Sequence, residues 1–279
     1  MTKIMTAFTV CKIMYGDMQC MNINPKKIYM RASYQAAKIA GTTAHIKEGL
    51  RYSIYDLLIG LMLPSGNDAA LVLAENFGRY MTIEQCRNST TTLKEYCEQD
   101  PYDPEVSKKH IAKFIKRMNQ EATKLKLVNS SFSNPHGLSD KANKSSAQDV
   151  VRLTYVALKY PIISEIIKNS YYESNVVFDW SPKRSLEDRG FLVSQNWHNL
   201  NILLNDPAGR YKGVKTGQTP NAGSCLSTLY EDVKKGHRFI IVVIGTNTNK
   251  HRFQETTKLV NWCIGQQLKA NMIKNNQFS

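Results

Sequence analysis

The chain has 279 residues, 42% of them hydrophobic, which suffices for one domain with a large core, and no apolar run reaches the ~18 residues of a membrane-spanning helix. The first residues lack the apolar stretch and the cleavage site of a secretory signal, so we expect neither a signal peptide nor a membrane span in this chain. The net charge of +14 favours anionic partners, but without a zinc-finger, helix-turn-helix or stacking-aromatic signature we expect no nucleic-acid partner.

The N-terminal part of the chain is predicted to be largely helical. Residues 2–15 carry apolar side chains near helical spacing without an internal Pro or Gly, which indicates a buried helix with Lys3 in its first turn. Residues 28–34 indicate short extended pieces. Residues 54–63 predict an apolar helix that ends at Pro64.

Another helix is predicted to start just after Ser65. Asp68 lies in its first turn, where a carboxylate interacts favourably with the helix dipole, and apolar residues follow. The tripeptide Ser65-Gly66-Asn67 therefore lies between two helices.

Residues 84–110 differ in composition from the flanking segments. They are polar and charged and contain two Asp-Pro turn signals, which predicts an inserted surface segment. Cys86 and Cys97 lie within it and are the pair most readily joined in an oxidising compartment. Residues 111–127 then resume helical periodicity.

The second half of the chain is predicted to combine helices with strands. Asn134-Pro135-His136-Gly137 is a loop by its turn residues, a helix follows over residues 146–160, and residues 176–192 are ambiguous. Three antiparallel strands and a closing helix are then expected, over residues 213–217, 224–230, 239–245 and 253–268. We therefore expect a single α+β domain over residues 1–279, with an antiparallel sheet packed against a helical cluster.

Three short motifs at widely separated positions carry the chemistry. Thr2-Lys3 opens a helix, Ser65-Gly66-Asn67 lies between helices, and Lys215-Thr216-Gly217 lies on a strand. Each motif alone is weak, since Ser-Gly-Asn is an ordinary turn. Their order and placement match the S-x-x-K, S-D-N-like and K-T-G set of serine acyltransferases.

With these motifs the chain resembles the low-molecular-weight penicillin-binding proteins that act as D-alanyl-D-alanine carboxypeptidases, of the β-lactamase/transpeptidase-like fold. The resemblance covers nearly the whole chain apart from the polar insertion. It also includes family-like stretches at residues 1–7, 64–70, 132–138, 199–204 and 213–219.

The resemblance implies a mechanism in which a serine attacks the carbonyl between two D-alanines and forms an acyl-enzyme that water releases. Lys3, one helical turn after that serine, would take its proton, and Lys215 would lower the pKa of Lys3. Ser65 would pass a proton to the leaving amine, and Asn67 would hold the substrate amide. His136 is assigned a role in ordering its loop.

The resemblance also implies the substrate contacts. Thr216 and Arg252 would bind the terminal carboxylate, and beyond Gly217 the backbone N–H of Gln218 would donate to the oxyanion. The implied partner is a peptidoglycan stem peptide ending in D-Ala-D-Ala, with β-lactams as inhibitors and a secreted, periplasmic or extracellular location. No cofactor follows from this chemistry, and the histidines and cysteines lack metal-ligand spacing, so we expect no metal.

The position of the nucleophile departs from the family pattern. The S-x-x-K spacing puts the serine immediately before Met1, so we expect this chain to start at an internal methionine of a longer protein and to be inactive as written. The first strands of the family's sheet would then also be missing. Ser65 lies on the other side of the expected cleft, so we do not expect it to replace the missing serine.

Two other functions remain possible on the same fold. A β-lactamase would need an added carboxylate to activate the deacylating water, and the Asn134-Pro135-His136-Gly137-Leu138 stretch favours the carboxypeptidase instead. A binding module that recognises stem peptides or β-lactams without turnover is favoured only by the missing serine. A serine codon directly upstream of Met1 would remove that support.

Overall fold

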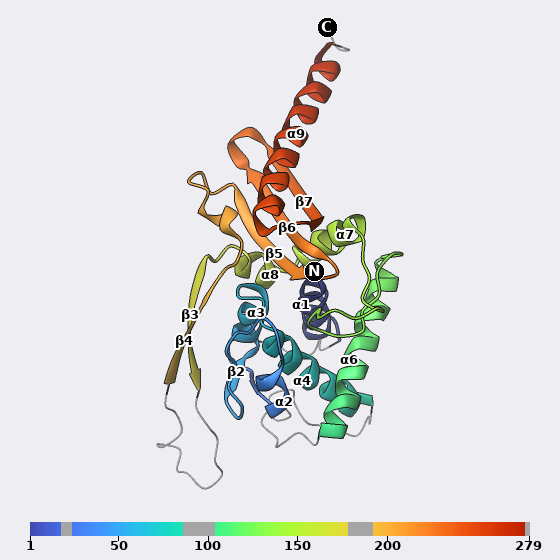
Figure 1. The fold of residues 1–279 in the computed structure, drawn as a ribbon, viewed down its shortest axis with the longest axis vertical. Helices are drawn as coiled ribbons and strands as arrows, with labels where there is room; N and C mark the ends of the chain where they lie inside the picture. The colour runs from blue at the N-terminus through green and yellow to red at the C-terminus, as the bar shows by residue number, and fades with distance from the viewer. Residues whose placement is uncertain (18–23, 86–103, 178–191, 277–279) are drawn as a thin grey trace.

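The computed structural model describes residues 1–17, 24–85, 104–177 and 192–276 (Figure 1). Its strands are β1 (Tyr29–Arg31), β2 (Arg51–Ser53), β3 (Tyr171–Val177), β4 (Leu192–His198), β5 (Tyr211–Thr219), β6 (Gly223–Asp232) and β7 (His237–Thr246). Its helices are α1 (Thr2–Lys12), the π-helix η1 (Ile13–Asp17), α2 (Tyr34–Lys38), α3 (Ile54–Met62), α4 (Asn67–Gln85), α6 (Pro104–Lys124), α7 (Ala147–Ala157), α8 (Pro161–Ile166), the 3-10 helices η3 (Ile202–Asn205) and η4 (Val233–Lys235), and α9 (Asn249–Asn276). Over these ranges, no helix has the length and apolar character needed to cross a membrane.

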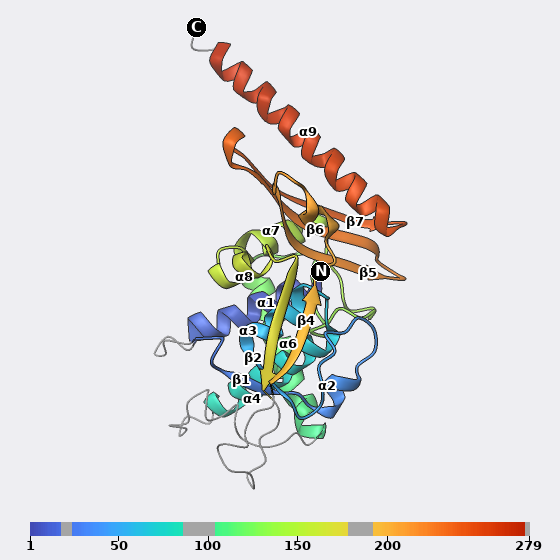
Figure 2. The ribbon, with the colours of Figure 1, turned by 90° about the vertical axis from the view of Figure 1, so that its left-hand side faces the viewer.

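The described strands form two antiparallel sheets, one in the order β1-β2-β3-β4 and one in the order β5-β6-β7. The sheet of β5, β6 and β7 lies between α9 on one side and the other helices on the opposite side (Figure 2). Among the described strands, β7 pairs only with β6, so its other edge has no partner there. The fold is therefore α+β, as predicted, with an antiparallel sheet packed against a helical cluster.

Apolar side chains fill both interfaces of this sheet. Val214 and Leu229 belong to the large core that the helical cluster forms. Tyr230 and Val260 belong to a smaller core between the sheet and α9. Because successive side chains of a strand point to opposite faces, β6 can contribute Leu229 to one core and Tyr230 to the other.

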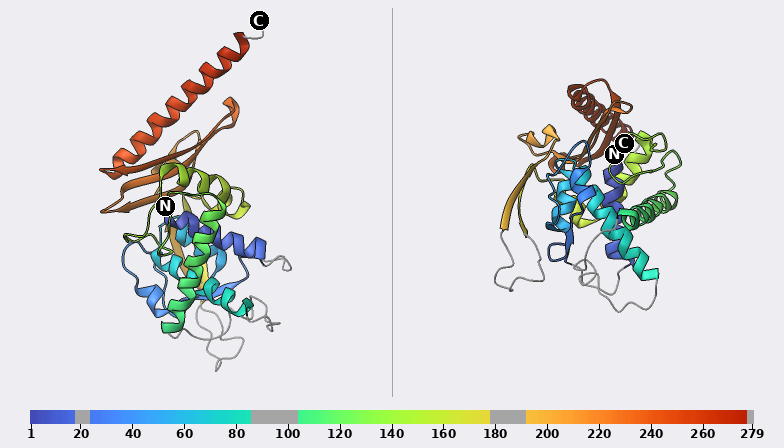
Figure 3. Two further views of the ribbon diagram at one scale, coloured as in Figure 1. Left: turned by 90° about the vertical axis from the view of Figure 1, so that its right-hand side faces the viewer. Right: turned by 60° about the horizontal axis from the view of Figure 1, so that its bottom comes forward.

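Helix α1 lies at the centre of the helical cluster (Figure 3). Every residue from Lys3 to Cys11 is buried, as expected for a helix that is apolar on all sides. Lys3, Thr6 and Thr9 are polar exceptions within that stretch, and the first two donate side-chain hydrogen bonds to backbone carbonyls of the loop around His136. The N-terminal turn of α1 is therefore attached to a loop far along the chain.

Helices α3 and α4 confirm the two helices that were predicted on either side of the Ser65 tripeptide. The Ser53 side chain caps α3 by accepting a hydrogen bond from the Asp56 backbone N–H, and α3 ends just before Pro64. Asp68 lies in the first turn of α4, as predicted. The two helices thus hold the tripeptide between them.

Helix α6 differs from its predicted extent, because it begins at Pro104 rather than at residue 111. Ser107 and His110 in its first turns are buried, and a Cβ on Gly78 would lie 1.9 Å from the His110 carbonyl oxygen. Because the residues of these first turns are polar, the sequence did not indicate that they pack against α4. Residues 84 and 85 of the predicted insertion end α4, and residues 86–103, with Cys86 and Cys97, lie outside the described residues.

The hairpin of β3 and β4 was not predicted. Its strands pair in register from Tyr171–His198 to Val177–Leu192 and extend along one side of the helical cluster (Figure 1). Trp197 anchors it, because its indole N–H donates to the Ala44 carbonyl at 2.7 Å and the side chain is only 2% exposed. The intervening residues 178–191 lie outside the described ranges.

Candidate active site

All of the predicted site residues line one cleft of about 370 Å³ between α1, the start of α4 and the edge of β5. The cleft is lined by Met1, Lys3, Gly41, Thr42, Ser65, Asn67, His136, Leu138, Leu200, Lys215, Thr216, Gly217, Gln218, Asn249 and Arg252. No group of three or more His, Cys, Asp or Glu side chains suited to a metal ion occurs among the described residues. The cleft thus offers cations, hydroxyls and backbone amides.

Lys3 is held at the base of the cleft by two hydrogen bonds. Its Nζ donates to Asn67 Oδ1 and to the His136 carbonyl oxygen, both at 2.7 Å, and the residue is 6% exposed. Burial lowers the pKa of Lys3 to about 7, against the opposing attraction of Asp68. Near neutral pH a large share of Lys3 is therefore an uncharged amine that can accept a proton.

The Ser65 tripeptide adopts a constrained backbone. Ser65 has a φ of +66°, in the left-handed region, where a residue other than glycine is strained. Gly66 cannot carry a side chain, since a Cβ there would lie 2.5 Å from Asp68 Oδ1 and 2.7 Å from the Ala44 Cβ. This turn places both Ser65 and Asn67 on the cleft wall.

Asn67 and Asp68 fix the wall of the cleft by different contacts. The Asn67 amide group donates to the Ala40 carbonyl at 2.7 Å while its oxygen accepts from Lys3. The Asp68 carboxylate accepts from the backbone N–H groups of Ala44 and Ile46. Asn67 therefore orients Lys3 and connects Lys3 to the loop that precedes β2. These contacts are additional to the predicted role of Asn67, which is to hold the substrate amide.

Lys215 reaches the cleft from β5, directly after a β-bulge between Tyr211 and Val214. Gly213 in the bulge has a φ of +64°, and a Cβ there would lie 2.2 Å from the Ile167 carbonyl oxygen. Lys215 Nζ donates to the Thr216 carbonyl at 2.8 Å. Burial, Lys3 and Arg252 all lower the pKa of Lys215 well below its ordinary value.

Arg252 closes the other end of the cleft from the first turn of α9. Its Nη1 donates to the Gly217 carbonyl at 3.2 Å, the side chain is 6% exposed, and its buried Nε has no hydrogen-bond partner among the described residues. Burial lowers its pKa, but a guanidinium stays charged. A buried cation with a free donor favours an anionic ligand.

The backbone nitrogen of Met1 lies between these groups. A Cβ on Gly217 would be 3.4 Å from that nitrogen. Met1, Lys3 and Gly217 all line the cleft, so the position immediately before Met1 adjoins the edge of β5.

Sequence reasoning missed the part that backbone carbonyls play in this site. The His136 carbonyl holds Lys3, while the ring accepts from the Leu138 N–H and has its pKa lowered to about 4 by burial and by Lys3. The loop contacts of Ala40 and Thr42 were missed as well. The only signal in the sequence was the Asn-Pro-His-Gly turn, which marks a fixed loop without saying what it contacts.

Known proteins resemble this chain in sequence and in fold. Residues 109–248, half of the chain, match the profile of a family described as D-alanyl-D-alanine carboxypeptidase. The chain is 29% identical over 278 residues to the D-alanyl-D-alanine carboxypeptidase DacF of Bacillus subtilis, covering 99% of this chain but 58% of that protein. It is 28% identical over 264 residues to the D-alanyl-D-alanine carboxypeptidase of Streptomyces sp. strain K15, covering 94% of this chain and 76% of that protein. The crystal structure of the Streptomyces K15 DD-transpeptidase matches with a TM-score of 0.72 and 27% identity, over 95% of this chain and 86% of that one.

Proposed function

Since the chain belongs to the D-alanyl-D-alanine carboxypeptidase family, we propose that its cleft is the active site of a serine-type enzyme that removes the terminal D-alanine from peptides ending in D-Ala-D-Ala. The observation that carries this proposal is the environment of Lys3. A lysine with a pKa of about 7, fixed by Asn67 and His136 beside the position before Met1, is suited to activate a serine there.

The proposed reaction starts with a serine at the position before Met1. Lys3 takes the hydroxyl proton as the serine oxygen bonds to the carbonyl carbon between the two D-alanines. The Gln218 N–H donates to the oxyanion that forms. The C–N bond then breaks, and the leaving amine receives its proton through Ser65, which leaves an acyl-enzyme that water hydrolyses.

The substrate's terminal carboxylate is assigned to the Arg252 end of the cleft. Arg252 and Lys215 both lie there, Thr216 is next to Lys215 on β5, and all three side chains line the cleft. A carboxylate bound there leaves the scissile carbonyl near the Met1 nitrogen and Gly217. This arrangement supports a carboxypeptidase, which recognises the free end of its substrate.

The partners follow from the same proposal. Peptidoglycan stem peptides are the substrates, and β-lactams acylate the same serine as inhibitors. The enzyme then works where peptidoglycan is exposed, in a secreted, periplasmic or extracellular location. The chain spans about three fifths of the Bacillus subtilis relative, so these assignments concern the catalytic domain.

Acylation by a fluorescent penicillin tests the proposal on two proteins, residues 1–279 and the same chain preceded by a short segment ending in serine. Only the serine-containing protein should be labelled, because only it carries the hydroxyl that Lys3 would activate. Replacing that serine by alanine is the matched control. Absence of labelling in both proteins, with both folded by circular dichroism, would exclude the serine mechanism and leave a binding protein.

The pH dependence of labelling tests the role of Lys3. Since the pKa of Lys3 is about 7, the labelling rate should rise as the pH increases from 6 to 8 and then level off, because the neutral amine is the base. Lys3→Arg, which stays protonated, should reduce the rate by about a hundredfold or more. A rate independent of pH over this range would assign proton removal to another group.

A further inference from the structure

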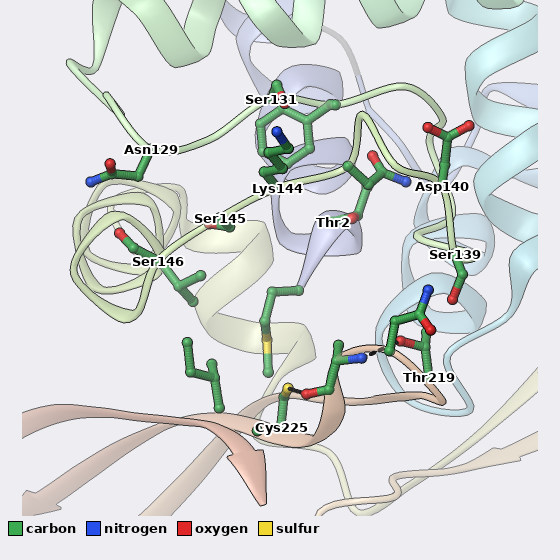
Figure 4. Close-up of a pocket in the computed structure, with 18 of the residues that line it drawn as sticks. Thr2, Asn129, Ser131, Ser139, Asp140, Lys144, Ser145, Ser146, Thr219 and Cys225 are labelled. Atoms are coloured by element: carbon green, nitrogen blue, oxygen red, sulfur yellow. Dashed lines mark hydrogen bonds between the residues drawn. The ribbon is translucent and has the colours of Figure 1, made fainter.

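The first turn of α1 lies against the loop over residues 129–146. Thr2 lines one recess together with Ser139 and Asp140 of this loop (Figure 4). A Cβ on Gly137 would lie 3.0 Å from Thr2 Oγ1, so the backbone of the loop approaches α1 closely. The turn that carries the proposed base is therefore packed directly against this loop.

Two side chains of α1 hold consecutive carbonyl groups of the loop. Lys3 Nζ donates to the His136 carbonyl oxygen at 2.7 Å. Thr6 Oγ1 donates to the Pro135 carbonyl oxygen at 2.6 Å. Residues three apart lie on the same face of a helix, so both donors reach the loop from one face of α1. Among the described residues, these two are the side chains of α1 that form hydrogen bonds with the loop.

The Thr6 hydroxyl is fully buried and has a single proton to donate. Its other neighbour, the Thr2 carbonyl oxygen, is 3.4 Å away, a longer contact than the one to Pro135. Because hydroxyl hydrogen bonds are short, the proton is directed at the Pro135 carbonyl. That carbonyl has no other donor among the described residues, so removal of the hydroxyl would leave it buried and unpaired, which is unfavourable.

Other side chains shape the loop without joining it to α1. Asn119 of α6 exchanges two hydrogen bonds with the Phe132 backbone, at 2.7 and 3.0 Å. Within the loop, the Asn143 amide group donates to the Leu138 carbonyl. The separation between the loop and α1 is therefore fixed by the hydrogen bonds and the packing of α1 itself.

We propose that Thr6 is a positioning residue for the proposed base. Its hydroxyl holds the Pro135 carbonyl, and through the next peptide unit the His136 carbonyl, so that Lys3 stays oriented and shielded from water. The inference rests on the proposed function of the cleft, since this orientation matters only if Lys3 activates a serine. Thr6 itself does not line the cleft, so it acts through the loop and not on the substrate.

The role of Thr6 has a measurable consequence for Lys3. Without the hydroxyl, the Pro135 carbonyl would turn toward water and the loop would move away from α1. Water would then reach the Lys3 amine, and because burial is the largest cause of its lowered pKa, that pKa should rise. A rise of about one unit, from about 7, would reduce the neutral fraction of Lys3 at pH 7 about fivefold.

The pH profile of acylation by a fluorescent penicillin tests this role in residues 1–279 preceded by the segment that ends in serine. In Thr6→Val, which keeps the shape of the side chain without the hydroxyl, the midpoint of the profile should rise by about one pH unit. Thr6→Ser, which keeps the hydroxyl, should retain the original midpoint. Thr9→Val is the matched control, because Thr9 is equally buried on the same helix and its hydroxyl has no hydrogen-bond partner among the described residues.

The outcomes separate the role of Thr6 from the proposed function. An unchanged midpoint in Thr6→Val, or an equal displacement in Thr6→Val and Thr9→Val, would overturn the positioning role while the cleft keeps its function. If circular dichroism shows that Thr6→Val does not fold, Thr6→Cys replaces it and should raise the midpoint by a smaller amount, since a thiol is a weaker donor. Absence of labelling of the unsubstituted protein at every pH would overturn the proposed function itself, and this inference with it.

Discussion

At the scale of single residues, burial shifts the pKa values of two lysines in the cleft and of one glutamate outside it. It lowers the pKa of Lys3 and Lys215 and raises that of Glu75, in each case as the largest cause. Lys3 donates its two hydrogen bonds to an amide oxygen and a carbonyl oxygen, which hold the amine without a hydrogen bond to a carboxylate. A lysine held in this way can be neutral and still be precisely oriented.

Glu75 offers a test of burial away from the cleft. It is fully buried on α4, accepts hydrogen bonds from the Ser33 and Ser107 hydroxyls, and has a pKa of about 7 instead of 4.5. Because the folded state holds this proton more tightly than the unfolded state, its stabilising contribution is complete below about pH 4.5 and is lost as the pH rises through 7. The pKa of His136 is lowered, so its contribution to stability has the opposite pH dependence. That contribution is complete above the ordinary pKa of 6.5 and is lost as the pH falls to the folded value of about 4.

Comparison of the wild-type chain with Glu75→Gln isolates the Glu75 contribution. Between pH 5 and pH 8, the free energy of unfolding of the wild-type chain should fall relative to that of the variant by up to about 3 kcal/mol. Urea unfolding of both proteins at the two pH values measures this difference. The same pH dependence in both proteins would mean that folding does not raise the pKa of the Glu75 carboxyl.

At the scale of elements, the bulge in β5 positions the Lys215 motif. Gly213 and Val214 both have positive φ values, of 64° and 122°, immediately before Lys215. A β-branched residue with positive φ is strained, and surrounding contacts must hold it in place. The close approach of Gly213 to the Ile167 carbonyl fixes the bulge against the end of α8.

Two glycines with nearly equal positive φ values separate strain from steric clash. Gly213 and Gly236 have φ values of 64° and 67°, but a Cβ on Gly213 meets the Ile167 carbonyl oxygen at 2.2 Å, while one on Gly236 meets nothing within 4 Å. Gly236→Ala should lower the free energy of unfolding by about 1–2 kcal/mol, and Gly213→Ala by at least about 3 kcal/mol. Equal losses in urea unfolding would mean that the bulge can move away from α8.

At the scale of the whole molecule, the cleft is assembled from three layers whose residues lie far apart along the chain. Lys3 comes from the helical cluster, Lys215 from the sheet, and Arg252 from the outer helix α9. The sheet is covered on one face by the large core and on the other by the smaller core around Val260. The position of Arg252 therefore depends on how α9 is attached to the sheet.

Val260 tests this attachment two turns beyond Arg252. It is 1% exposed, whereas its neighbour Leu259 is 38% exposed. Val260→Ala should lower the free energy of unfolding by about 2 kcal/mol and weaken binding of a D-Ala-D-Ala peptide two- to threefold, while Leu259→Ala should change stability by less than about 0.5 kcal/mol. Urea unfolding and calorimetry measure both effects, and unchanged affinity in Val260→Ala would show that Arg252 is held by its own contacts alone.

The sequence by itself determined the type of most elements. Helical periodicity and Pro64 gave α1, α3 and α4, and β-rich runs between turns gave β5, β6 and β7, because these signals are local. The start of α6 was wrong because Ser107 and His110 are polar and become buried only by contact with α4. The hairpin of β3 and β4 was missed because both strands have polar centres, Glu173-Ser174-Asn175 and Ser194-Gln195-Asn196, and so lack the apolar run that marked β5, β6 and β7.

The sequence also predicted side chains that line one cleft, since three motifs in a fixed order pick them out even when they lie far apart. Only the tertiary structure decided how these side chains are held. Lys3 finds its two partners 64 and 133 residues away, and one of them is a backbone carbonyl, a group that every residue carries and no motif can reveal. The pKa of Lys3 is lowered because distant segments exclude water from it, and exclusion of water is a property of the packed molecule.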